Sequence, residues 1–509
     1  MKIKMRNIFL HLYFLLCEVL MKIKINPPAR YYIRKSNYYL RNKQNLDAVE
    51  ILEQGIKIYP YSYELNLKLA KWNFTDKKWE KSAFYWEEIF SLNENQPLKN
   101  YHQYITCLKK CKKDEKNKII LNTALTYYPT NRKLLIEGVH NAIRRFDWRM
   151  ALEYYGNLDR EQLNYSFKLQ WKQAMIYQMV GNHNKAKVLY NDLYSNEKYN
   201  TDYTKLVLFN NGESRIEFYK QHNNTNKVCF TFDSINNTWN KKPFAFKFLL
   251  KENVDIIAVR RRRADSYQQD LSRESFMMTV KTPVEYYDKK ISYGFSLGAY
   301  SALYYSSPLN CDILAISPRN SMHPIYGKRN PPKGKFNHEL HLKTNKNIKP
   351  VIAYDPKNKL DNTFIEKELK KAYPDGLFMQ YPYAGHRVAP YFRDTGLLKH
   401  FVRAVIYDQD ITQYKKVDNF KSPQYIKNLG NACLKRNKYN WALKMGDKAL
   451  ELSPSSVGAI KLKIQALIKL KRYQEVLNIV DYQLTEKDVA NMKLTKTIED
   501  IKNHIVKQQ

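Results

Sequence analysis

Residues 291–305 read ISYGFSLGAYSALYY, and this stretch decides how the middle of the chain folds. A short β-prone run enters Gly294-Phe295-Ser296-Leu297-Gly298, and small and apolar residues at helical spacing follow it. This order predicts a strand, a tight turn and a helix, with the hydroxyl of Ser296 exposed at the end of a sheet. The two glycines permit the sharp backbone and the close approach of helix to strand that such a turn needs.

The sequence on either side of this turn predicts the sheet. Between residues 206 and 410, short apolar β-rich runs alternate with helical segments, at 228–232, 255–259, 291–295, 312–317, 350–354 and 377–381. Near-continuous apolar strands separated by crossovers indicate a mostly parallel sheet that is buried on both faces by helices. Ser296 follows the third of these runs.

Candidate partners for Ser296 follow later strands. His386, in the sequence YAGHR at 383–387, comes after the last expected strand and before a helical run. Asp355 and Asp361 follow the strand at 350–354. Either carboxylate is able to orient His386 and compensate its charge.

Residues 228–407 resemble an α/β-hydrolase, both in the turn motif and in the order of nucleophile, acid and histidine. The resemblance implies that Ser296 attacks an ester and that His386 is the general base, without a cofactor or metal ion. It favours Asp361 as the acid, because Phe364 occupies the apolar position three residues further on, and leaves Asp355 as the alternative.

The same resemblance implies two donors for a tetrahedral oxyanion. One is the backbone N–H of Leu297, directly after the nucleophile, and the other comes from the loop that contains Ser234. That loop lacks the glycines of the lipase type, so the resemblance does not extend to a lipase activity.

Basic residues at 260–263 directly follow the strand at 255–259, at the sheet edge where the active site is expected. We expect Arg260 and Arg261 to bind a phosphate or carboxylate of the substrate. The alternative is a solvated loop or a contact with the helical segments. Tyr267 is expected to line the pocket, and the insertion at 319–349 to cap it.

Helical repeats flank this region. Small residues recur at Ala48, Ser82, Asn117, Ala151 and Ala186, and a similar pattern returns around Gly430, Ala442 and Ala449. Both stretches resemble tetratricopeptide repeats, which implies all-α solenoids that dock a protein partner. The expected division is 21–205 for the first array, 206–410 for the α/β-hydrolase domain and 411–509 for the second array.

Residues 1–20 contain an apolar run, too short to span a bilayer, that His11 and Glu18 interrupt. They are either a leader or lie upstream of a true start at Met21, which we favour because MKIK recurs there.

The chain has 509 residues and a formal net charge of +37. Because its basic residues are spread along the whole length, we expect a generally basic surface and no nucleic-acid partner, with an anionic partner as the alternative. The six cysteines are scattered and complete no metal site, which predicts free thiols in a reducing compartment. A cytoplasmic location is expected, with attachment to the inner face of the membrane as a further option.

These features lead to one main functional hypothesis and two alternatives. The main hypothesis is a serine esterase or deacylase that forms an acyl-enzyme with an ester-bearing small molecule or glycan. An acyltransferase would use the same Ser296 and His386, and a scaffold would use neither. The arrangement of domains is similar to that of hydrolase-like proteins of bacterial cell-surface polysaccharide loci.

Overall fold

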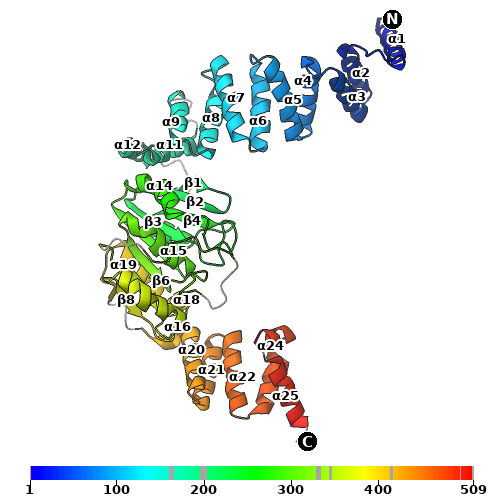
Figure 1. Cartoon of the computed structure of the whole chain (residues 1–509). Helices are drawn as coiled ribbons and strands as arrows, with labels where there is room; N and C mark the ends of the chain where they lie inside the picture. Colours follow the sequence, from blue (N-terminus) through cyan, green and yellow to red (C-terminus); the bar gives the residue numbers. More distant parts are fainter. Residues whose placement is uncertain are drawn as a thin grey trace. The chain divides into compact units, whose positions relative to one another are not determined.

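The computed structural model describes residues 2–159, 166–194, 203–327, 334–342, 347–412, 417–492 and 494–506. The chain forms two compact units, Met1–Ile176 and Tyr177–Gln509. The described part of the first unit is helical, and the second contains the sheet and the C-terminal helices (Figure 1). Among the described residues, no helix combines the length and the apolar character needed to cross a bilayer.

Helices of the first unit follow one another in antiparallel pairs after α1 (Lys2–Lys22). The first helices of the pairs are α2 (Ala29–Arg41), α4 (Tyr63–Thr75), α6 (Leu98–Lys110), α8 (Arg132–Arg144) and α11 (Phe167–Met179). The boundary between the two units falls within α11. The second helices within this unit are α3 (Asn45–Ile58), α5 (Trp79–Leu92), α7 (Asp114–Tyr127) and α9 (Trp148–Gly156).

The repeat period is confirmed by these second helices, which begin at residues 45, 79, 114 and 148, at intervals of 34, 35 and 34. The predicted small positions Ala48, Ser82, Asn117 and Ala151 are all buried. Small side chains at these positions allow the paired helices to approach closely, as a helical solenoid requires.

An eight-stranded sheet forms the centre of the second unit, in the order β1-β2-β4-β3-β5-β6-β7-β8. The six predicted runs become strands β3 (Lys227–Phe232), β4 (Asp255–Arg261), β5 (Lys289–Phe295), β6 (Asp312–Ile316), β7 (Val351–Tyr354) and β8 (Leu377–Gln380). These six strands are mutually parallel. The hairpin of β1 (Tyr203–Asn210) and β2 (Ser214–Gln221), which was not predicted from the sequence, adds to β4 in the antiparallel direction.

Helices cover both faces of this sheet (Figure 1). One face carries α13 (Phe246–Lys251), α18 (Val388–Asp394) and α19 (Leu397–Ile406), whose apolar residues share a core with those of the strands. The other face carries α14 (Arg273–Val284) and α15 (Leu297–Ser306), where the rings of Phe276 and Tyr305 pack against Phe232. The remaining short helices are η1 (Ser307–Leu309), α16 (Lys359–Phe364), η2 (Ile365–Leu369) and α17 (Lys370–Ala372). The predicted α/β-hydrolase fold class between helical arrays is confirmed.

Helix α12 (His183–Tyr194) packs a tyrosine ring against a buried ion pair of the sheet. The ammonium of Lys220 lies 2.6 Å from the carboxylate of Asp255, and neither side chain is exposed. The ring of Tyr190, from α12, lies 4.8 Å from the same ammonium. A charge pair enclosed by aromatic rings therefore joins the last helix of the first array to β2 and β4.

C-terminal helices complete the second unit: η4 (Asn419–Lys421), α20 (Pro423–Lys435), α21 (Tyr439–Leu452), α22 (Val457–Lys469), α23 (Tyr473–Gln483), α24 (Glu486–Met492) and α25 (Thr495–Val506). The predicted small positions Gly430, Ala442 and Ala449 are buried between them. A β-carbon at Gly430 would lie 2.9 Å from the β-carbon of Met445 in α21, so a side chain there would require the two helices to shift.

Candidate active site

Ser296 lies in a strained turn between β5 and α15. Its φ of 54° is in the left-handed region, which residues with a side chain adopt at an energetic cost. A β-carbon at Gly294 would lie 2.1 Å from the carbonyl oxygen of Gly298, and one at Gly298 would lie 2.5 Å from that of Phe232. Both glycines of the motif are therefore required for the turn and for the packing of α15 against β3.

A chain of hydrogen bonds links Ser296 to His386 and to Asp361. The Oγ of Ser296 lies 2.9 Å from Nε2 of His386, and Nδ1 of His386 lies 2.9 Å from Oδ2 of Asp361. The carboxylate of Asp361 is fully buried at the start of α16, while His386 lies in the loop after β8. The segments that follow β5, β7 and β8 thus bring a hydroxyl, a carboxylate and an imidazole together in one chain of hydrogen bonds.

Asp355, the alternative acid, has a different set of contacts. Its carboxylate accepts hydrogen bonds from the backbone N–H groups of Lys357, Tyr383 and Gly385, at 2.8, 3.1 and 2.7 Å. Burial raises the pKa of Asp355, and these three donors oppose that rise. Asp355 therefore holds the backbone of the loop that carries His386, and Asp361 makes the contact with the imidazole.

Arg319 holds the other side of Asp361 and was not identified from the sequence. Its Nη2 and Nε lie 2.6 and 2.8 Å from Oδ1 of Asp361, and Nη2 also donates to the side-chain oxygen of Asn358 at 2.7 Å. The backbone N–H of Arg319 donates to the carbonyl of Ser296. The available signal was a basic residue just after β6, the strand beside the one that carries the serine.

Both backbone N–H groups named as candidate oxyanion donors lack a hydrogen-bond acceptor among the described residues. Leu297 is the first residue of α15, and its N–H has no acceptor among the described residues. The N–H of Ser234, in the loop after β3, likewise has none in the described part of the chain. The carbonyl of Ser234, which belongs to the next peptide group, accepts a hydrogen bond from Nη2 of Arg261.

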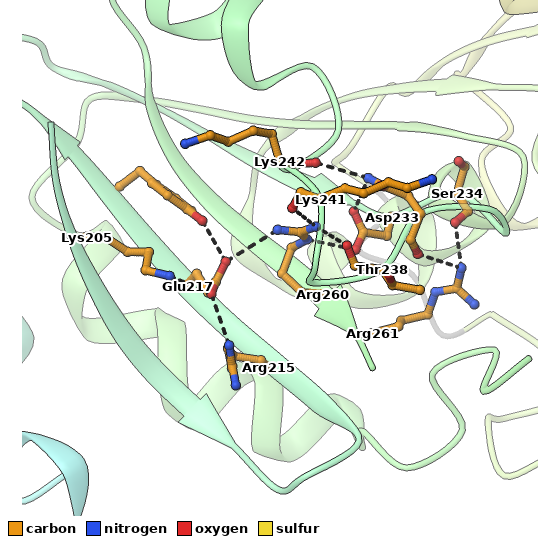
Figure 2. Close-up of polar contacts among 12 residues, drawn as sticks. Lys205, Arg215, Glu217, Asp233, Ser234, Thr238, Lys241, Lys242, Arg260 and Arg261 are labelled. Atoms are coloured by element: carbon orange, nitrogen blue, oxygen red, sulfur yellow. Dashed lines mark hydrogen bonds and ion pairs between the residues drawn. The ribbon is translucent and has the colours of Figure 1, made fainter. Parts of the chain in front are cut away.

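Arg260 lies inside the protein instead of at the substrate edge, and Figure 2 draws its polar contacts there. Its Nε donates to the buried carboxylate of Asp233 at 2.7 Å, and its Nη2 donates to the carbonyls of Thr238 and Lys241. Glu217 of β2 lies 3.4 Å from its Nη1. The expectation that Arg260 binds a substrate anion is wrong, because internal carboxylates and carbonyls already engage its guanidinium.

Arg261 is also fully buried. Its Nη2 donates to the carbonyls of Ser234 (Figure 2) and Asn237, and its Nη1 donates to that of Ala264. The substrate contact expected of Arg261 is therefore wrong for the same reason. Together the two arginines organise the loop at 233–241, which contains the second expected oxyanion donor.

Tyr267 lies in the interior, with 5% of its surface exposed. Both Tyr267 and the next residue, Gln268, have left-handed backbone conformations, with φ of 50° and 55°. Gln268 is fully buried and accepts a hydrogen bond from Ser301 of α15. Tyr267 therefore belongs to a tight turn packed against α15 and presents little surface to a ligand, contrary to expectation.

The predicted cap at 319–349 packs on α15 where it is described. The ring of His338 stacks on Tyr304 at 4.2 Å between centroids, and its Nε2 lies 2.9 Å from the carbonyl oxygen of Gln268. Burial lowers the pKa of His338 to about 4, so this imidazole is neutral at physiological pH. Residues 328–333 and 343–346 of the predicted cap lie outside the described residues.

No protein-family model and no curated protein matches this chain. Similar solved structures include an esterase of Pyrococcus furiosus, with 16% identity and a TM-score of 0.29, over 40% of this chain and 90% of that one. An α/β serine hydrolase without a lid from Xanthomonas campestris has 13% identity and a TM-score of 0.27, over 41% and 97%. A tetratricopeptide repeat protein of Parabacteroides merdae has 18% identity and a TM-score of 0.26, over 33% and 66%.

Proposed function

We propose that this protein is a serine hydrolase that cleaves carboxylic esters through an acyl-enzyme. The observation that carries the proposal is the line of hydrogen bonds from Ser296 through His386 to the buried Asp361. A serine in a strained turn beside an oriented imidazole is the arrangement that activates a hydroxyl as a nucleophile.

In the proposed reaction, Oγ of Ser296 attacks the ester carbonyl while Nε2 of His386 takes the serine proton. The N–H groups of Leu297 and Ser234 stabilise the oxyanion, each by about 2.7–4 kcal/mol if they act like donors of known serine hydrolases. The ester C–O bond then breaks, and the imidazolium returns the proton to the leaving alkoxide. Water attacks the acyl-enzyme with His386 again as the base, which releases the acid and restores the serine.

The buried carboxylate supports this cycle. Asp361 accepts a hydrogen bond from Nδ1 of His386, which leaves Nε2 free to accept the serine proton. It also compensates the positive charge that forms on the imidazole. Arg319 balances the charge of the carboxylate in the resting state and fixes its orientation.

The proposed substrate is an ester-bearing small molecule or an acylated glycan, and the helical arrays are proposed to dock a protein partner. The proposed location is the cytoplasm, with the basic surface placing the protein at an anionic membrane face.

Labelling with a fluorophosphonate probe tests the proposal. The wild-type protein is expected to label, and Ser296→Ala and His386→Ala to lose labelling while keeping the wild-type melting temperature. A folded wild type that does not label would contradict the proposal and favour a scaffold. If labelling succeeds, transfer of an acyl group to a glycan in preference to water would identify an acyltransferase.

A further inference from the structure

The loop that carries His386 is held by the first helix of the C-terminal repeats. Nδ2 of Asn428 donates to the carbonyl of Tyr383 at 2.9 Å. Nε2 of Gln424 donates to the carbonyl of Arg387 at 2.7 Å and also to that of Ala384. Two amide side chains of α20 therefore hold carbonyl groups on both sides of His386.

The opposite edge of the same loop is held from within the sheet domain. Asp355 accepts the N–H groups of Tyr383 and Gly385, while α20 provides donors for the carbonyls. Gly385 has a φ of +74°, and a β-carbon there would lie 2.7 Å from Nδ2 of Asn428. The loop thus lies between Asp355 and α20, and its left-handed backbone at Gly385 favours glycine.

Helix α20 is itself attached to the sheet domain beside this loop. Its N-cap, Ser422, is fully buried, and the hydroxyl donates to the carboxylate of Asp394 at 3.1 Å. The hydroxyl of Tyr391 donates to the side chain of Asn419, just before the helix. Because α18 carries both Tyr391 and Asp394, the start of α20 is joined to the element that directly follows the His386 loop.

We propose that Gln424 and Asn428 are positioning residues for His386, so that the C-terminal repeat array is part of the active site. The inference rests on the proposed hydrolase function for its effect on catalysis. Within the loop itself, the N–H of Ala384 donates a hydrogen bond to the carbonyl of Tyr381. Few other hydrogen bonds inside the loop restrain its carbonyl groups. The amides of α20 provide that restraint, and they hold the imidazole in line with both Ser296 and Asp361.

The test uses the full chain with the isosteric pair Gln424→Glu and Asn428→Asp, which replaces each donor by a carboxylate oxygen that faces a carbonyl. Gln424→Ala with Asn428→Ala removes the donors without adding charge. The matched control is Asn431→Asp, one turn further along α20, whose side chain has no hydrogen bond among the described residues. The rate of p-nitrophenyl acetate hydrolysis is measured and divided by the concentration of active sites. That concentration is obtained by titration with the fluorophosphonate probe.

The double carboxylate variant is expected to lower kcat about 10- to 100-fold, since three hydrogen bonds of modest net strength are lost. KM should stay within about twofold, because these residues do not touch the substrate. The alanine pair should lie between this variant and the wild type, and Asn431→Asp should match the wild type. An unchanged kcat per titrated site in the folded double variant would overturn the proposal, because a merely structural role lowers only the amount of active protein.

Hydrogen exchange of the peptide 382–388 provides a readout that does not need activity. Faster exchange is expected in both double variants and not in Asn431→Asp. If the wild type does not react with the probe, the hydrolase proposal fails, and the catalytic part of this inference fails with it. Unchanged exchange in the double variants would show that α20 does not restrain the loop, whether or not the enzyme is active.

Discussion

The substitution Asp361→Asn tests the site most directly, because Arg319 dictates how the new amide must lie. Nε and Nη2 of Arg319 both donate to Oδ1 of Asp361, at 2.8 and 2.6 Å. A guanidinium has only donors, so the amide oxygen must occupy the Oδ1 position. The amide NH₂ then occupies the Oδ2 position, which lies 2.9 Å from Nδ1 of His386.

That amide donates to Nδ1, so the imidazole proton moves to Nε2, the nitrogen that faces Ser296. The serine proton then has no acceptor. In a known serine protease the same change of tautomer lowers kcat about 10,000-fold, which corresponds to about 5.4 kcal/mol in the barrier. We expect a loss of that order for Asp361→Asn, with little change in the melting temperature because the shape of the side chain is kept.

The assay is the second-order rate of fluorophosphonate labelling, together with kcat/KM for p-nitrophenyl acetate. Asp355→Asn is the comparison, and about a tenfold loss is expected because one backbone N–H of the His386 loop loses its acceptor. Adding Arg319→Met to Asp361→Asn frees the amide to rotate, so activity should rise above that of the single variant. A loss for Asp355→Asn that exceeds the loss for Asp361→Asn would refute the assignment of the acid.

Three substitutions test the scaffold. Gly298→Ala should cost about 1–3 kcal/mol of stability by overpacking against Phe232, whereas Gly156→Ala, which meets no atom within 4 Å, should leave the melting temperature unchanged. Lys220→Met should cost about 3–5 kcal/mol at neutral pH in urea titrations. Burial raises the pKa of Asp255 and Lys220 opposes that rise, so loss of the lysine raises this pKa further. A carboxyl group whose pKa is raised in the folded state stabilises the fold at low pH, and this stabilisation is lost as pH rises. The loss of stability caused by Lys220→Met should therefore be smaller at acid pH than at neutral pH. A larger loss at acid pH would contradict this reasoning. Arg260→Met should speed hydrogen exchange at 234–241, where it releases two carbonyls, and exposed Arg263→Met should not.

Much of the fold could be predicted because it depends on patterns local in sequence. Each of the strands β3–β8 contains a mainly apolar run, since a parallel sheet with helices on both faces buries both sides of its strands. The repeat helices were found from small residues at a constant interval, and Ala48 and Ser82 are buried as that interval requires. The hairpin of β1 and β2 was missed because β2 buries polar residues such as Glu217 and Lys220, whose partners lie elsewhere in the chain.

The sequence alone determined the strand–turn–helix around Ser296, since the glycine spacing constrains the local backbone, and it placed His386 in the loop after the last strand. Only the tertiary structure shows that Asp361 and not Asp355 contacts the imidazole of His386, because that contact depends on how the segments after β7 and β8 meet. Arg260 was misassigned for the same reason. A sequence shows that a residue is charged, but whether that charge faces solvent or a buried carboxylate depends on segments far away in the chain.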